Sequence, residues 1–351
     1  MRKMLFLLVT GAWALLASES FSHKDWKVAC DNTHTCRMAG HTEHTVDWED
    51  VPLSILIERD AGPKSRISGF IHVDNSMGNL DMYNLTDRTL KMYIGTWVYV
   101  IDPSGKLSQA QTDSLIDALV KDQEIRLTYG DSYEWSVSLE GSFAAMLKMD
   151  DYQKRIGTIG AMFKKGKQNE DNVLKAEPVP VIDVPRFYPN TEADATLLEL
   201  PMTDGEQQLL QHLLGRFYSK QGGDTCWMEA EEAKETLKVY RLTETTALAS
   251  QRCRTETHDD TKAFWLINAA PPFEPKFVHS ATGLYVYHDG TLRMSGARSA
   301  IGPIGGWESE HRVWNGKEFV KSSHCASSQC RDFPDGVWDL PTFISAVNVQ
   351  E

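Results

Sequence analysis

Short runs that alternate apolar and polar residues dominate the first half of the chain. In WKVAC (26–30) the residues Trp, Val and Cys alternate with Lys and Ala, which is typical of a half-buried β-strand. Further β-prone runs predict strands within 52–63, 68–74, 90–102, 124–129 and 133–140. Gly130-Asp131 is a turn signal between the last two runs. The first half is therefore expected to be mainly β.

Three helices interrupt the strands, and two of them begin at a capping box. Ser108 stands three residues before Gln111, and Thr203 stands three residues before Glu206. The third helix is predicted over FAAMLKMDDYQKR (143–155). In two of the helices, apolar residues at helical spacing are expected to face the core. They are Phe143, Met146, Leu147 and Met149 in the helix over 143–155, and Leu209, Leu210, Leu213, Leu214 and Phe217 in the helix that begins after Thr203.

Strands dominate again near the C-terminus, where two dipeptides predict hairpins. Asp289-Gly290 and Asn315-Gly316 each stand between short β-prone runs. Such dipeptides favour a two-residue type I′ turn, because both central residues of that turn need a positive φ. The predicted fold class is therefore mainly β (α+β), with two β-rich domains of antiparallel strands and a few helices.

A polar and then proline-rich segment separates the two halves. The stretch 164–190 is charged at first and then carries four prolines between Pro178 and Pro189. Proline removes backbone donors and favours extended neighbours, so this composition predicts a semi-rigid linker. The predicted division is a signal peptide at 1–20, an N-terminal domain at 21–165, a linker at 166–190 and a C-terminal domain at 191–351.

The N-terminus has the layout of a secretory signal peptide. Arg2 and Lys3 precede an apolar run over 4–17, and Ser18 and Ser20 form a small-x-small cleavage pair. An uncleaved anchor is the alternative, but 14 residues are short of the roughly 20 that span a bilayer. Periplasmic or secreted localisation is therefore expected, with no membrane span after cleavage.

The overall charge narrows the range of partners. The formal net charge is −13, and removing residues 1–20 changes it to 34 − 48 = −14. Such a charge disfavours binding to nucleic acid or to anionic lipid and mildly favours basic proteins. Solubility alone explains the charge equally well. Aromatic residues at 10% and charged residues at 24% are typical of globular rather than disordered chains.

All six cysteines lie in the part that would be exported, where thiols are expected to pair. Six cysteines allow 15 connectivities. Because short loops cost less entropy to close, neighbours in sequence are favoured. Zinc is the alternative at the first pair, with His34, His41 and His44 nearby, but the usual two pairs of closely spaced ligands are absent. The predicted disulfides are Cys30–Cys36, Cys226–Cys253 and Cys325–Cys330.

Several motifs resemble one bacterial family over essentially the whole exported chain. They are DWKVACDNTHTCR, PLSILIERDAGP, MLKMDDYQKRIGT, TCWMEAE, SQRCR, VWNGKEFV and CRDFPDGVWDLPT. The chain resembles the bacterial domain-of-unknown-function 1176 family, and its W-x-V-x-C start is also similar to the invasion-associated locus B family. Both resemblances imply an exported, β-rich bacterial protein. Neither implies a catalytic mechanism, a ligand or a cofactor.

The sequence lacks the standard local patterns of catalysis. It contains no G-x-S-x-G elbow, S-x-x-K pair, H-E-x-x-H helix or phosphate-binding glycine loop. No catalytic, cofactor or metal residue is therefore assigned. A triad assembled from distant segments is still the main alternative, because such sites are defined by geometry and not by sequence order.

A few local clusters have residue types found in sites but are better explained structurally. The residues His41, His44, Asp47, Glu49 and Asp50, and the run His258, Asp259, Asp260, are expected to form solvated loops, although the first group has ligand types that suit a divalent cation. Asp151 and Arg155 are expected to pair on one helical face, with a partner contact at Asp151, Gln153 and Arg155 as the alternative. Exposed tryptophans mark interfaces. Trp307 and Trp314 are candidates of this kind, but packing in the core is the expected role of both.

These observations predict a non-enzymatic protein of the cell envelope that binds another envelope or exported protein. The charge favours one version, in which the chain is an inhibitor or immunity protein against a basic effector. The alternative function is an envelope hydrolase with a Ser/His/Asp site assembled across the fold.

Overall fold

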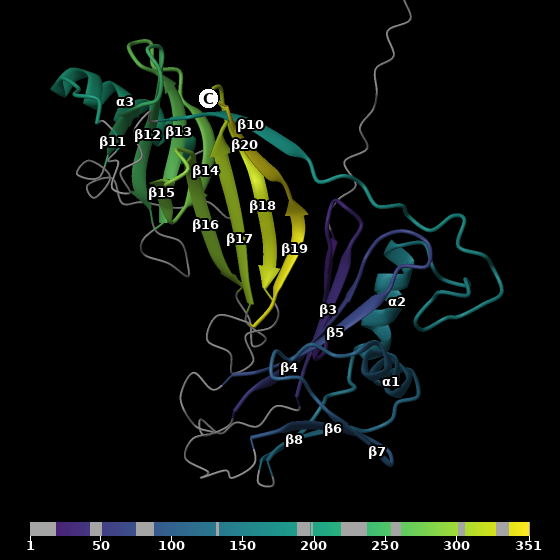
Figure 1. Cartoon of the computed structure of the whole chain (residues 1–351). Coiled ribbons are helices and arrows are strands. Elements are labelled where there is room, and N and C mark those ends of the chain that lie inside the picture. The colour runs from purple at the N-terminus through teal and green to yellow at the C-terminus, as the bar shows by residue number, and fades with distance from the viewer. Residues whose placement is uncertain are drawn as a thin grey trace, which may run out of the picture.

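The computed structural model describes residues 19–42, 51–74, 88–130, 133–187, 197, 199–218, 237–253, 261–300, 306–327 and 337–350. These residues form antiparallel sheets with three helices, so the predicted mainly β fold class is confirmed. Figure 1 shows two lobes, with β1–β9, α1 and α2 in the N-terminal lobe and β11–β19 and α3 in the C-terminal lobe. Among the described helices, none is both long and apolar enough to cross a membrane.

The N-terminal lobe combines two sheets and two helices. The first sheet is an antiparallel meander in chain order, and the second has the order β7-β6-β8-β9. The elements are β1 (Glu19–His23), β2 (Trp26–Cys30), β3 (Cys36–His41), β4 (Leu53–Arg59), β5 (Ile67–Val73), β6 (Leu90–Ile94), β7 (Trp97–Val100), α1 (Gln109–Val120), β8 (Ile125–Tyr129), β9 (Tyr133–Ser136) and α2 (Ser142–Tyr152).

Side-chain alternation explains how the core of this lobe forms. Trp26, Val28 and Met38 are buried from β2 and β3, and they join Leu115 of α1 and Met146 of α2 in one apolar cluster. Helix α1 begins at the predicted capping box, because Ser108 and Gln111 each accept a hydrogen bond from the other's backbone N–H. The two helices therefore cover one face of the first sheet.

The C-terminal lobe contains two further antiparallel sheets and one helix. The sheet orders are β11-β12-β13-β14 and β15-β16-β17-β18-β19. The elements are α3 (Asp204–Tyr218), β11 (Lys238–Arg241), β12 (Thr246–Cys253), β13 (Thr261–Asn268), β14 (Lys276–Ala281), β15 (Gly283–Val286), β16 (Leu292–Ala300), β17 (Gly306–Trp314), β18 (Phe319–Ser327) and β19 (Asp339–Ile344).

Helix α3 confirms its predicted start but only part of its predicted apolar face. Thr203 and Glu206 form the capping box. Leu210 and Leu214 are fully buried against the β11–β14 sheet, in a cluster with Trp265. Leu209 is exposed, and so is Phe143 of α2, so the assignment of these two residues to the core face was wrong.

Both predicted hairpins are present, but the predicted type I′ turn is wrong. Strands β15 and β16 flank Asp289-Gly290, and β17 and β18 flank Asn315-Gly316. The two glycines have positive φ, whereas neither Asp289 nor Asn315 does. The Asp289 carboxylate instead accepts the N–H of Thr291, and the side-chain oxygen of Asn315 accepts two backbone N–H groups. These side-chain bonds stabilise turns that need only one positive φ.

The segment between the lobes is an extended strap, which we define as residues 166–187. Its first part is fastened to the N-terminal lobe, where Leu174 accepts a hydrogen bond from Gly62 and donates one to the carbonyl of Gln153. Its second part contains β10 (Val181–Pro185), which pairs in parallel with β20 (Ala346–Gln350). Figure 1 shows the strap passing from one lobe to the other.

A joint connects the lobes where β19 packs on the outer face of the first sheet. Leu340 of β19 is fully buried against Ala29, Ala39 and Leu56, and Trp338 packs beside them. The two alanines bring little side-chain bulk to this face, so a strand from the other lobe can approach closely. The first sheet is consequently buried on both faces.

Polar contacts fix the orientation of this joint. The side chain of Asn32 accepts a hydrogen bond from the N–H of Ile344 and donates one to its carbonyl, at 2.7 and 3.1 Å. The indole N–H of Trp338 donates to the Ser54 hydroxyl at 2.9 Å. Because these groups come from residues about 300 positions apart in sequence, the joint is a true long-range contact.

One predicted disulfide is confirmed, one stays a prediction, and the predicted Cys325–Cys330 disulfide is wrong because Cys325 is not bonded. Cys30 and Cys36 are bonded and face each other where β2 and β3 pair. Cys253 is disulfide-bonded as well, but its predicted partner Cys226 lies outside the described residues. Cys325 carries a free thiol, and its predicted partner Cys330 also lies outside the described residues.

A substitution at Gly40 tests how tightly the N-terminal core is packed. A Cβ at this position would lie 2.4 Å from the indole ring of Trp26. That ring cannot retreat easily, because it is fully buried and its N–H donates to the Ser138 carbonyl. We expect Gly40→Ala to lower the free energy of unfolding by about 1–3 kcal/mol in urea titration.

The matched control is Gly205→Ala in the first turn of α3, where a Cβ would meet nothing within 4 Å. At that position the change should raise the free energy of unfolding by about 0.5–1 kcal/mol, since alanine favours the helix more than glycine does. Equal urea midpoints for Gly40→Ala and the unmodified protein would contradict the packing described for Trp26.

Candidate functional site

The candidate residues at the end of α2 form a buried ionic network. Gln153 and Arg155 lie just beyond the helix and are fully buried, whereas Asp151 is exposed. Arg155 donates from Nη1 to Glu170 at 2.7 Å and from Nε to Gln153 at 2.8 Å. Its Nη2 donates to the Gly62 carbonyl at 2.6 Å. Arg155 therefore pairs with Glu170 and not with Asp151, because the helix ends at Tyr152 before the expected spacing is complete.

Two further charged residues, Asp150 and Arg59, complete this network, and no signal in the sequence pointed to Arg59. The fully buried carboxylate of Asp150 accepts backbone N–H bonds from Met162 and Phe163. Arg59 lies 3.7 Å from the Asp150 carboxylate. Burial, together with the neighbouring charge of Arg155, lowers the pKa of Arg59 to about 10. Burial likewise raises the pKa of Asp150, against the opposing effect of the amide donors.

The network is structural in character. Its donors and acceptors hold the loop 60–65 and the segment around Glu170 against the end of α2. Gly160 permits the close approach of Glu170, since a Cβ there would lie 2.0 Å from the carboxylate. The network is the anchor of the strap's first part.

The remaining sequence candidates do not converge on one site. Trp314 is buried and packs against Phe319 at 5.3 Å between ring centroids, which fits core packing. Trp307 lies in β17. His41 is buried at the end of β3. The other members of both histidine-acid clusters lie outside the described residues, namely His44, Asp47, Glu49, Asp50, His258, Asp259 and Asp260.

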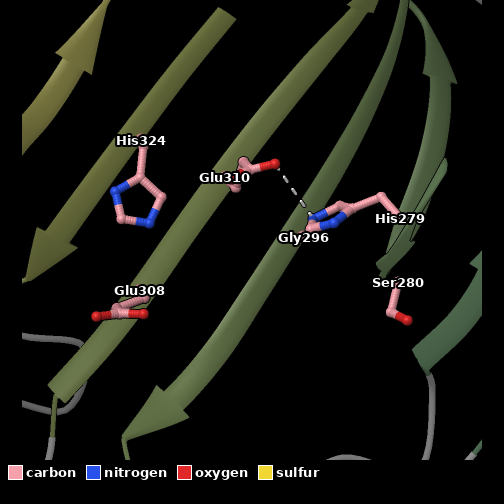
Figure 2. Close-up of a pocket in the computed structure, with 6 residues that line it drawn as sticks. All are labelled: His279, Ser280, Gly296, Glu308, Glu310 and His324. Carbon is pink, nitrogen blue, oxygen red and sulfur yellow. Dashed lines mark ion pairs between the residues drawn. The ribbon is translucent and has the colours of Figure 1, made fainter. Parts of the chain in front are cut away.

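A polar cavity lies on the C-terminal lobe, where four strands meet. Its volume is about 150 Å³. Figure 2 shows its lining, with His279 and Ser280 from β14, Gly296 from β16, Glu308 and Glu310 from β17, and His324 from β18. We call it the His279–His324 cavity. Among the described residues, no group of three or more histidine, cysteine or acidic side chains is placed to hold a metal ion.

Local backbone geometry explains why these side chains gather. Glu308 and Glu310 are two positions apart on one strand, so both point to the same face. Gly296 leaves room for β14 to approach, because a Cβ there would lie 3.0 Å from Nε2 of His279 and 3.2 Å from the Ser280 carbonyl. The glycine at that position of β16 therefore lets His279 and Ser280 lie close to the strand.

Glu310 is the electrostatic centre of the cavity wall. Its Oε1 accepts from Arg312 Nε at 2.6 Å and lies 3.8 Å from Nε2 of His279, and its Oε2 lies 3.1 Å from Lys321 Nζ. Burial alone would raise the pKa of Glu310, but the charges of Arg312, His279 and Lys321 lower it below its usual range. Glu310 is therefore ionised and its charge is already compensated.

His324 is held in a neutral form on β18, next to Glu310 in the strand register. Its Nδ1 lies 2.5 Å from the Thr342 hydroxyl. Burial and the neighbouring charge of Lys321 lower the pKa of His324, while the carboxylates of Glu308 and Glu310 partly oppose that effect. The imidazole is thus uncharged at pH 7 and can accept or donate one hydrogen bond toward the cavity.

The free thiol next to His324 in sequence is not suited to nucleophilic chemistry. Burial and the Asp339 carboxylate raise the pKa of Cys325, with Arg37 and Ser309 acting against them. A raised pKa leaves the thiol protonated, and the thiol is a much poorer nucleophile than the thiolate. Cys325 therefore gives no support to a cysteine-based activity.

The sequence did not reveal this cavity, although one signal was present. The alternation in WESEHR (307–312) places two glutamates on one face of a predicted strand, which is unusual beside a core. Nothing in the sequence indicates that His279 and Ser280 lie near these glutamates, because that contact joins two sheets.

The fold and the cavity define a two-lobed, mainly antiparallel β protein with a disulfide and a polar pocket in the sheet of its C-terminal lobe. Residues 20–345 match the family described as "Protein of unknown function (DUF1176)". The chain belongs to this family. It is similar to the "Uncharacterized protein YpfG" of Escherichia coli (strain K12), with 24% identity over 266 residues, which cover 74% of this chain and 70% of that protein. No solved structure matches the chain.

Replacing Arg155 tests the buried network. Arg155→Met keeps most of the side-chain volume but removes the nearer of the two cations beside the buried Glu170 carboxylate, leaving Arg59 at 3.9 Å. We expect a loss of about 3–5 kcal/mol in the free energy of unfolding, measured by urea titration. The control is Lys121→Met, which breaks an exposed pair with Asp117 and should cost no more than about 0.5 kcal/mol. A loss for Arg155→Met as small as that of the control would show that the network is not needed.

The electrostatics around His324 can be tested by NMR titration of its imidazole signals. The pKa of His324 should lie below the ordinary value of 6.5. Lys321→Gln should raise it, because a nearby positive charge is removed, and Glu308→Gln should lower it, because a negative charge is removed. A shift of the same sign in both variants would contradict this arrangement.

The lowered pKa of His324 also has a consequence for stability. The unfolded chain binds a proton at His324 more readily than the folded chain does. The contribution of His324 to the free energy of unfolding is therefore complete above pH 6.5, and it decreases as the pH falls through 6.5 toward the pKa of the folded state.

Proposed function

We propose that the chain is an exported, non-enzymatic protein of the bacterial cell envelope that binds another envelope or exported protein. Export is supported by the signal-like segment 1–20 and by the Cys30–Cys36 disulfide, which is typical of oxidising compartments. The W-x-V-x-C start of the chain is similar to that of the invasion-associated locus B family. A distant relationship to that family is part of the same proposal.

The observation that carries this proposal is the edge strand β7. It is the first strand of the sheet β7-β6-β8-β9, so one side of its backbone has no neighbouring strand in that sheet. Trp97, Val98 and Val100 are 69%, 53% and 61% exposed. Soluble proteins usually protect such edges with charged residues, prolines or bulges. The sequence WVYV has no charge or proline, and its pairing with β6 is regular.

An edge of this kind is suited to pairing with an extended segment of a partner. The partner strand would take backbone hydrogen bonds from β7 and pack apolar side chains on Val98 and Val100, as in β-strand addition. Tyr99 faces inward, where its hydroxyl lies 2.8 Å from that of Ser114, so β7 is fixed before a partner arrives. The net charge of the chain favours a basic partner, such as a cell-wall-directed effector.

A hydrolase is the second candidate, because the His279–His324 cavity brings serine, histidine and glutamate together from separate strands. The arrangement favours it less. In Figure 2 the Ser280 hydroxyl points away from the His279 ring, whereas a serine nucleophile must point toward its base. Glu310, the carboxylate near His279, is also engaged by Arg312 and Lys321.

The role of β7 can be tested by capture from a periplasmic extract, identification of the captured protein and measurement of its affinity with both proteins purified. Val98→Lys should weaken that affinity at least about tenfold, because a charged side chain on an edge strand opposes strand addition. Val179→Lys is the matched control, since Val179 is also exposed but lies in the strap, and it should leave the affinity unchanged. High salt should weaken binding further if the partner is basic.

Equal affinity of the Val98→Lys variant and the unmodified protein would contradict the proposal for β7. Turnover of model esters or peptidoglycan that Ser280→Ala abolishes would contradict a purely binding function. A second copy of the chain bound at β7 would appear as a dimer in analytical ultracentrifugation that Val98→Lys dissociates.

A further inference from the structure

The His279–His324 cavity is built like a ligand site, because groups outside it hold its polar lining in place. Arg312 and Lys321 fix Glu310, and Thr342 fixes His324. A preorganised lining of this kind lowers the cost of binding, since few side chains must be ordered when a ligand enters.

The lining offers mainly hydrogen-bond acceptors. The Thr342 hydroxyl is placed to donate to the carbonyl of His324 at 3.4 Å, and it then accepts the Nδ1 proton of the same imidazole. In that tautomer Nε2 of His324 carries a lone pair. This nitrogen, the carboxylates of Glu308 and Glu310, and the Ser280 hydroxyl all accept hydrogen bonds.

Glu308 is the lining carboxylate whose charge no described side chain compensates. Within the described part of the chain, no ion pair or hydrogen bond reaches its carboxylate, in contrast to the engaged carboxylate of Glu310 on the same strand. Its side chain is exposed at the cavity, so a ligand can reach it. A bare carboxylate beside a neutral imidazole repels anions and attracts donors that carry a positive charge.

The size of the cavity limits the ligand to a small group. Cavities of roughly 150 Å³ in other proteins accommodate an aromatic ring of about six carbon atoms. The His279–His324 cavity, at about 150 Å³, has room for a guanidinium or ammonium head with one or two methylene groups. No cluster of three metal ligands is present among the described residues, so an organic cation suits this lining better than a metal ion.

We propose that the His279–His324 cavity binds the guanidinium or ammonium head of an organic cation, with Glu308 as its ion-pair partner and His324 Nε2 as an acceptor. This site goes beyond the function proposed for β7, because it lies in the other lobe and can be occupied whether or not a partner pairs with that strand.

The proposal can be tested by NMR titration of the full exported chain, following the imidazole signals of His279 and His324. The probes are ethylguanidinium and propylammonium, compared with the neutral N-ethylurea and with acetate. The cations should shift both histidines in a saturable manner, and the neutral probe and the anion should bind at least about tenfold more weakly. Equal binding of N-ethylurea, or no saturable shift with either cation, would overturn the proposal.

Variants separate recognition of charge from recognition of shape. Glu308→Gln should weaken the binding of ethylguanidinium at least about tenfold, since an ion pair becomes a neutral hydrogen bond. Gly296→Ala should weaken it through a different cause, because the added Cβ narrows the cavity beside His279. The control Glu318→Gln, an exposed carboxylate in the β17–β18 turn, should leave it unchanged. Unchanged affinity in Glu308→Gln would overturn the proposal even if the cation binds.

A last comparison distinguishes the two sources of such a cation. A blocked tripeptide with a central arginine tests a protein side chain, and agmatine tests a free metabolite-like cation. Binding of both supports a cavity open to protein partners, and binding of agmatine alone supports a site for small molecules. The β7 variant Val98→Lys should leave all these affinities unchanged, so a failure here is independent of any failure in partner capture.

Discussion

The Arg155 guanidinium is the interaction on which the arrangement of the chain depends. It is fully buried and bonds Glu170, Gln153 and the backbone of the 60–65 loop at once. Such a group is costly to bury unless nearly every donor is used, and here the partners come from three separate segments. The end of α2 therefore determines where the strap leaves the N-terminal lobe. The strap then reaches β20, so one buried cation influences how both lobes are connected.

Local patterns predicted most elements of this fold, and non-local contacts account for what they missed. The alternation of Trp26, Val28 and Cys30 and the box at Ser108 depend only on near neighbours, so they could be recognised from sequence. The partner of Arg155 could not be, because Glu170 lies in an irregular segment whose path depends on tertiary contacts. Leu209 fits an apolar helix periodicity, but only its neighbours Leu210 and Leu214 are buried against the sheet.

The candidate site was harder to predict than the fold for the same reason. A hairpin pairs residues that are close in sequence, so Glu310 and His324 could have been placed side by side from the register of β17 and β18. His279 belongs to another sheet and reaches them only because Gly296 lacks a side chain. Sequence patterns describe one strand at a time, whereas this cavity depends on the distance between two sheets.

The joint imposes an order on folding. Ala29 and Ala39 belong to a meander whose strands are neighbours in sequence, yet Leu340, which covers their outer face, lies about 300 residues further along the chain. In an exported chain the meander crosses the membrane first and can pair before Leu340 follows. Until then the first sheet presents an apolar face with nothing to cover it. A chaperone that keeps this face from aggregating would have a longer task here than in a protein whose domains close from local segments.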